Sequence, residues 1–197
     1  MKTFAPMPYN LSDIDLVRLV AGEAAVRDYA ATPSLRALVF PRVIPAKLSR
    51  ARRKIEAARE IIQRALAEDL KAGTSLASPS QVKDYLKLRI GSLEHEEFWC
   101  VFLDVQLQVI ECEQLFRGTL AETTVYPREI VKRALQWNAG AVILAHNHPS
   151  GSEDPSTADL SLTRNIREAL KLVGVRVVDH FVICANKTVS FAERGLL

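Results

Sequence analysis

The sequence contains few cysteines, and none of them has the spacing of a metal-binding or redox pair. Of its 197 residues only Cys100, Cys112 and Cys184 are cysteines, and no Cys-x-x-Cys occurs. An odd number of widely spaced cysteines does not describe a disulfide scaffold. We therefore expect three buried, reduced thiols.

Long hydrophobic runs are also missing. No apolar stretch approaches the roughly 20 residues that span a bilayer, so no membrane contact is expected. The first residues, "MKTFAPMPYNLSDIDL", lack the apolar core of a secretory signal. The sequence predicts a cytoplasmic protein.

The sequence has no large excess of either charge, but its basic and acidic residues are unevenly distributed along the chain. The net charge is +3, which does not indicate a nucleic-acid coat. Residues 1–74 contain 13 Lys and Arg against 8 Asp and Glu, whereas residues 75–197 contain 13 against 15. The first part is therefore net basic (+5) and the second slightly acidic (−2).

The pattern of elements predicts an α+β fold in two regions. Residues 1–74 read as helices, one of them capped by Ser12 and ending near Gly22, and a long one ending near Gly73. Residues 73–81 are rich in small residues and are the candidate linker. In residues 75–197, buried strands such as "EEFWCVFLDV" and "AVILA" alternate with helices such as "STADLSLTRNIREALKLVG".

The stretch "AHNHPSGSEDPSTAD", residues 145–159, is the main candidate site. In an extended chain His146 and His148 project to one side and Asn147 to the other. Two imidazoles and an oxygen ligand, for which Asp159 is the best candidate, could bind zinc and leave one position open. Alternatively, Ser156 and Asp159 form only a capping box at a helix start.

A hydrolytic metal site also needs a base, and two glutamates precede the first buried strand. Glu96 would share a strand face with Phe98, and Glu97 would share the other with Trp99. Both faces are apolar, so periodicity does not choose between these carboxylates. A solvated strand end remains the alternative for either.

Several segments together resemble the JAB/MPN metalloprotease-like family with its JAMM motif, and its bacterial RadC branch in particular. They are "HNHPSGSEDPSTAD", "EEFWCVFLD", "LFRGTL", "YPREIVKRAL", "DHFVI" and "SFAERGLL", within residues 80–197. The resemblance implies a cytidine-deaminase-like, layered α-β-α fold with a curved, mixed, mostly antiparallel sheet. It also implies a zinc-dependent hydrolase acting on a peptide or isopeptide-like bond, with the substrate not specified.

Carried over by position, the resemblance assigns His146, His148 and Asp159 as zinc ligands. It makes Ser156 the donor to the developing oxyanion and Glu96 the general acid and base, with Glu97 as the fallback. Asp179 and His180 form a polar pair in an apolar strand. They are either a structural pair or support for the metal site.

RadC-like proteins often begin with a helix-hairpin-helix region, which residues 1–74 resemble only in part. No glycine lies between Gly22 and Gly73, so a glycine-lined approach to phosphate is not expected. A basic run remains, and it makes DNA a possible partner through salt-dependent phosphate contacts. The alternative function is therefore a DNA-associated binding or accessory protein, in repair, recombination or a mobile element, that uses these basic helices. The run comprises Lys47, Arg50, Arg52, Arg53, Lys54, Arg59 and Arg64. A solvated helix face is the alternative.

Overall fold

The computed structural model describes residues 8–31, 33–41, 48–71, 79–118, 125–184 and 187–197. These residues divide into two compact units, Met1–Arg64 and Ala65–Leu197, and the division falls within a long helix. The sequence predicts the domain boundary after residue 74. That boundary stays a prediction, because most of the candidate linker lies outside the described residues.

The first unit is helical. Its elements are a short 3-10 helix (Pro8–Asn10), α1 (Asp13–Ala21), α2 (Glu23–Ala31), α3 (Leu35–Val39) and the start of α4 (Arg50–Lys71). Ser12 caps α1 as predicted, because its hydroxyl accepts a hydrogen bond from the Asp15 amide at 3.2 Å. Gly22 ends α1 with φ of 88°, a conformation that favours glycine. The sequence analysis missed α2, which begins directly after that glycine.

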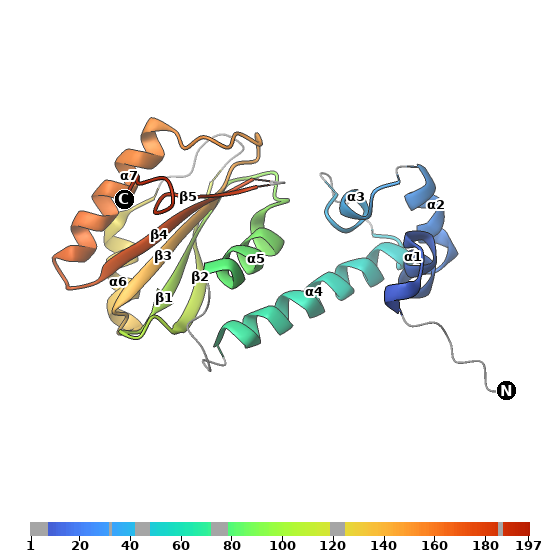
Figure 1. Cartoon of the computed structure of the whole chain (residues 1–197), viewed down its shortest axis with the longest axis horizontal. Coiled ribbons are helices and arrows are strands. Elements are labelled where there is room, and N and C mark those ends of the chain that lie inside the picture. The colour runs from blue at the N-terminus through green and yellow to red at the C-terminus, as the bar shows by residue number, and fades with distance from the viewer. Residues whose placement is uncertain (1–7, 32, 42–47, 72–78, 119–124, 185–186) are drawn as a thin grey trace. The chain divides into compact units, whose positions relative to one another are not determined.

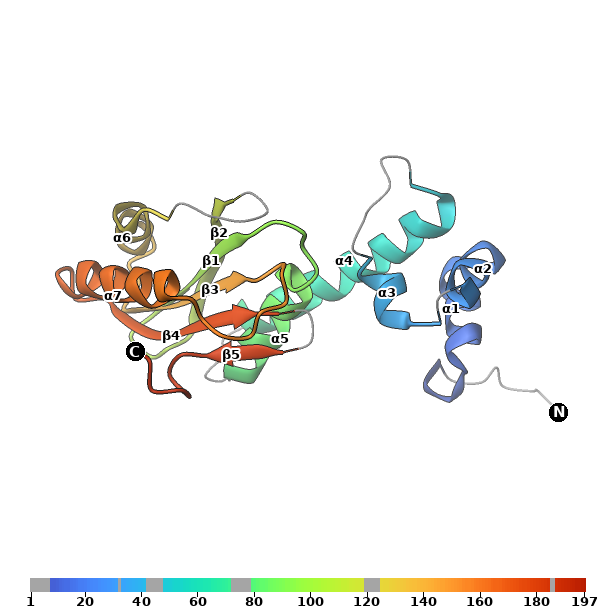
Figure 2. The ribbon, with the colours of Figure 1, turned by 90° about the horizontal axis from the view of Figure 1, so that it is seen from above.

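The second unit is an open, five-stranded sheet between helices (Figures 1 and 2). The strands lie in the order β2-β1-β3-β4-β5. Only β3 and β4 pair in parallel, so the predicted mixed, mostly antiparallel sheet is confirmed. The strands are β1 (Glu97–Leu103), β2 (Val109–Arg117), β3 (Ala141–Asn147), β4 (Arg176–Ile183) and β5 (Thr188–Ser190).

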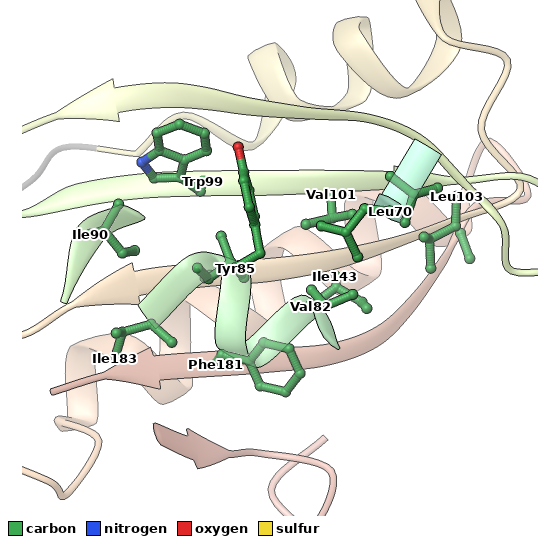
Figure 3. Packing of buried hydrophobic residues seen from close by; sticks show 14 residues of the cluster. Leu70, Val82, Tyr85, Ile90, Trp99, Val101, Leu103, Ile143, Phe181 and Ile183 are labelled. Atoms are coloured by element: carbon green, nitrogen blue, oxygen red, sulfur yellow. The ribbon is translucent and has the colours of Figure 1, made fainter. Parts of the chain in front are cut away.

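Helices cover both faces of this sheet, which gives the predicted α-β-α layering. On one face α5 (Pro79–Ile90) packs with the end of α4, and this core contains Tyr85, Leu86, Trp99, Ile143 and Phe181 (Figure 3). On the other face lie α6 (Pro127–Gln136) and α7 (Thr157–Lys171), packed over a second cluster. That cluster includes Phe98, Cys100, Phe102, Val142, Leu144 and Ile166.

The topology brings four chain segments together at one end of the sheet. Because β1 runs antiparallel to β3, the start of β1 lies beside the end of β3, and Phe98 pairs with His146. Because β4 runs parallel to β3, it ends there too, and His146 pairs with Val182. The loop after β3 leads into α7, whose first turn is at the same end.

The cysteines differ slightly from the expectation. All three are free thiols, as predicted, and Cys100 and Cys184 are buried. Cys112 is only partly buried, because it lies on β2, the edge strand of the sheet, where fewer neighbours cover it.

Candidate metal centre

His146 and His148 are positioned by the end of β3 and the turn that follows. His146 is buried and its ring stacks on Phe98, with the two ring planes 8° apart. The His148 amide donates to the Ile183 carbonyl at 3.0 Å, which continues the pairing with β4 for one more residue. The predicted alternation therefore holds, and both imidazoles lie on one side of the chain.

The turn after His148 fixes the orientation of its ring. His148 Nδ1 lies 2.9 Å from the Ser152 carbonyl, which can only accept a hydrogen bond. Nδ1 therefore carries the hydrogen, and Nε2 faces the candidate site. Gly151 closes the turn with φ of 80°, and its amide donates to the His148 carbonyl at 3.0 Å.

Asp159 lies on the first turn of α7 and takes part in two arrangements at once. Its Oδ2 accepts hydrogen bonds from the Ser156 amide at 2.7 Å and the Ser156 hydroxyl at 2.6 Å. The Ser156 hydroxyl in turn accepts from the Asp159 amide at 3.1 Å, so the predicted capping box is present. The same carboxylate also faces both histidines. Capping and facing the histidines are thus compatible, because a carboxylate has two oxygens and several lone pairs.

The three groups converge at separations that suit a small tetrahedral ion. His146 Nε2 and His148 Nε2 are 3.0 Å apart. Asp159 Oδ1 lies 3.2 Å from His146 Nε2, and Asp159 Oδ2 lies 3.5 Å from His148 Nε2. Zinc bonds of about 2.0–2.1 Å in a tetrahedron imply ligand atoms about 3.3 Å apart. His146, His148 and Asp159 are also the one cluster with metal-ligand character found among the described residues. The donor set and its spacing therefore fit zinc.

The pKa directions show that the Asp159 carboxylate stays ionised beside the two histidines. Burial raises the pKa of Asp159, but the contacts of its carboxylate with His146 and His148, together with the positive charge that these rings carry when protonated, outweigh burial and hold that pKa well below its usual range. The pKa of His148 is raised, first by its hydrogen bond with Asp159 and also by the charge of Glu96. Such a site attracts a cation.

The two candidate bases have different surroundings. Glu97 is buried with Trp99 on the α5 side of the sheet, where its oxygens bond His95 Nε2 and Trp99 Nε1, each at 2.9 Å. Glu96 directly precedes β1, and continuing the alternation of that strand puts it on the side of Phe98, whose ring stacks on His146. Glu96 is partly buried, and its charge acts on His148.

Asn147, between the two histidines, holds the backbone on both sides of Glu96. Its Oδ1 accepts from the Glu97 amide at 2.8 Å, and its Nδ2 donates to the His95 carbonyl at 2.9 Å. The Glu96 carbonyl itself accepts from the Gly118 amide at 2.8 Å. Sequence reasoning placed Asn147 only as facing away. The amide between two ligands was the signal that it missed.

His180 lies directly behind His146. Its Nε2 is 2.8 Å from His146 Nδ1, and its Nδ1 is 2.7 Å from the Thr163 hydroxyl. Burial, followed by the charge of His146, lowers the pKa of His180 well below its usual value. Thr163 was not singled out from the sequence, although it lies four residues after Asp159 and therefore on the same helix face.

Asp179 turns away from the candidate metal centre and fixes the C-terminal segment. Its carboxylate accepts hydrogen bonds from the Ser190 hydroxyl at 2.6 Å and the Ala192 amide at 3.0 Å. The side chains of the predicted polar pair therefore have different partners. Asp179 accepts hydrogen bonds from Ser190 and Ala192, and the His180 ring contacts His146.

The basic run of the first unit is partly neutralised within α4. Arg52 and Arg59 both pair with Glu56, and Arg64 pairs with Glu60. The Arg64–Glu60 pair is exposed, as on a solvated helix face, whereas the side chains of Arg52, Glu56 and Arg59 are mostly covered. Lys47 lies outside the described residues, and DNA binding through this region stays a prediction.

A layered domain with a mixed sheet and a His-x-His and Asp cluster at one sheet end is a JAB-type domain. The family model that matches residues 76–196 is described as the RadC-like JAB domain, and the chain belongs to this family. No described helix is both long and apolar enough to cross a membrane.

Similar proteins from other bacteria are named UPF0758 proteins. A UPF0758 protein of Thiobacillus denitrificans is 58% identical over 143 residues, which are 73% of this chain and 64% of the relative. A UPF0758 protein of Aromatoleum aromaticum is 47% identical over 183 residues, which are 92% of this chain and 75% of the relative. The matched region thus spans 64% to 75% of the length of these two relatives.

Proposed function

We propose that this chain is a zinc-dependent hydrolase that cleaves an amide bond, of the peptide or isopeptide type, in a peptide or protein substrate. The observation that carries the proposal is the convergence of His146, His148 and Asp159: the two Nε2 atoms are 3.0 Å apart, Asp159 Oδ1 lies 3.2 Å from the first, and Asp159 Oδ2 lies 3.5 Å from the second. Three protein ligands leave a fourth position of zinc open, as in catalytic rather than structural sites. Membership of the RadC-like JAB family supports the same reaction class.

Zinc held there would supply Lewis-acid chemistry, which polarises a carbonyl group and makes water nucleophilic near neutral pH. Proton transfer is the task of the protein. Glu96 would accept the proton from the attacking water and return it to the leaving amine. Its position two residues before Phe98, which pairs with His146, and its charge at His148 support this role. Glu97 is less suited, because hydrogen bonds to His95 and Trp99 occupy its carboxylate.

Ser156 would donate a hydrogen bond to the substrate oxygen as negative charge develops on it. Its hydroxyl hydrogen is directed at Asp159 Oδ2 in this structure. A rotation about the Cβ–Oγ bond would direct the hydrogen to the substrate instead. The oxygen would still accept from the Asp159 amide, so the helix cap would persist during catalysis.

Zinc content tests the proposal directly. The protein is loaded with zinc, loosely bound metal is removed by gel filtration, and the metal per chain is measured by mass spectrometry. We expect about one zinc per chain in the wild type and far less in Asp159→Ala, because that variant lacks the only anionic ligand. Asp154→Ala is the matched control, since Asp154 is exposed in the same loop and pairs with Arg194 instead. Equal, near-zero zinc in the wild type and Asp159→Ala would end the proposal.

A further inference from the structure

Two of the three candidate ligands are joined by a buried chain of hydrogen bonds. The chain starts at the backbone carbonyl of Asp159, which lies 2.6 Å from the Thr163 hydroxyl. It continues over 2.7 Å to His180 Nδ1 and over 2.8 Å from His180 Nε2 to His146 Nδ1. Thr163 and His180 are 2% and 0% exposed, so water does not compete for these bonds.

The carbonyl end gives the chain a direction. A carbonyl oxygen only accepts, so the Thr163 hydroxyl donates its one hydrogen to Asp159 and presents a lone pair to His180. His180 then carries its hydrogen on Nδ1 and has a lone pair on Nε2. That lone pair accepts from His146 Nδ1, which leaves the lone pair of His146 on Nε2, the atom that faces His148 and Asp159.

We propose that Thr163 and His180 are positioning residues that hold His146 in the one tautomer able to bind a metal through Nε2. This inference rests on the proposed zinc site, because it assigns the device that prepares one ligand of that site. Histidine ligands commonly donate their second ring nitrogen to a carboxylate or a backbone carbonyl. Here a second histidine accepts instead, and the helix that provides Asp159 also sets the proton order at His146.

Packing alone does not account for this arrangement. The His180 ring lies against Phe191 and Phe98, with ring centroids 4.7 Å and 5.6 Å away, and an apolar ring would fill that space as well. A buried imidazole is costly unless both of its nitrogens have partners. Both do, and the two partners are the groups that link it to Asp159 and His146.

The test compares Thr163→Val with Thr163→Ser in the full chain. Valine has nearly the same shape as threonine but no hydroxyl, so it removes the group that orders the protons and keeps the packing. Serine retains that hydroxyl and is the matched control. Zinc affinity is measured by competition with a chromophoric chelator, and the histidine tautomers are read from the ¹⁵N shifts of the metal-free proteins.

We expect His146 to carry its hydrogen on Nδ1 in the metal-free wild type and in Thr163→Ser. Thr163→Val should bind zinc at least tenfold more weakly, in the range of about 10–100-fold found for lost supporting partners of ligands. It should also show a mixture of His146 tautomers. Thr163→Ser should remain within about threefold of the wild type, since the hydrogen-bond chain is intact.

Two results would overturn the inference. One is a wild-type His146 with its hydrogen on Nε2, which would mean that the hydrogen bonds from Asp159 to His146 run in the opposite direction. The other is wild-type zinc affinity and an unchanged tautomer in Thr163→Val. If the wild type binds no zinc at all, the proposed function fails, while the tautomer in the metal-free protein still decides the inference.

Discussion

Replacing Asn147 by alanine removes two buried hydrogen bonds and frees the backbone on either side of Glu96. The Asn147 side chain is 2% exposed, and its partners are the Glu97 amide and the His95 carbonyl. Each partner that is left buried without its hydrogen bond costs about 1–3 kcal/mol. The bond to the His95 carbonyl is only partly buried, so water can replace part of it. We therefore expect a total destabilisation of about 2–4 kcal/mol.

Urea unfolding followed by tryptophan fluorescence measures this change. Both tryptophans, Trp99 and Trp137, belong to the second unit, so the signal reports the unit that contains Asn147. With a slope of about 2 kcal/mol per M urea, the midpoint should fall by about 1–2 M. Asn165→Ala, the same substitution at an exposed position of α7, should change stability by less than about 0.5 kcal/mol.

A loss below about 0.5 kcal/mol in Asn147→Ala, with an unchanged slope, would show that the two bonds contribute nothing. A large loss in the control as well would point to a general sensitivity of the unit. The expected pattern also predicts a functional effect, because Glu96 would no longer be held at a fixed distance from His148.

Two further predictions concern the candidate catalytic residues. Glu96→Gln should keep its zinc but lower the hydrolysis rate of a fluorogenic peptide library by about 10²–10⁴-fold, since the amide cannot transfer the proton. Glu97→Gln should reduce it far less, and the reverse order would make Glu97 the base. Ser156→Ala should lower the free energy of unfolding by about 1 kcal/mol through the lost helix cap, measured by urea unfolding. Ser161→Ala, exposed on the same helix, is the control, and an equal loss there would contradict the capping role.

The ligand geometry was within reach of sequence reasoning, because it depends on local rules. Alternation in an extended chain put His146 and His148 on one side, and the capping pattern located the start of α7. The same local rule left Glu96 and Glu97 open. The two glutamates differ because the Trp99 indole and the His95 ring surround Glu97 on the side where α5 packs. These are tertiary contacts, which the local pattern does not predict.

The supporting residues were harder to predict, since their roles depend on contacts between elements distant in sequence. Thr163 looks like an ordinary helix residue until β4 places His180 beside it. Asn147 looks unused until β1 pairs with β3 and brings the Glu97 amide to it. The second helix, α2, was missed for a local reason: alanine-rich "EAAVRDYAA" favours a helix but has no capping signal apart from the end of α1.

The hydrogen bonds that hold the three candidate ligands in place, namely the capping box at Asp159 and the bonds at the Nδ1 atoms of His146 and His148, have a thermodynamic consequence. The entropy lost in gathering these ligands is incurred when the domain folds, and not again when a cation arrives. Such a preorganised centre should take up metal with little conformational change. An ion that binds only the folded form should then raise the unfolding temperature with its free concentration. In a cell, the supply of metal would therefore help to set how much of this protein stays folded.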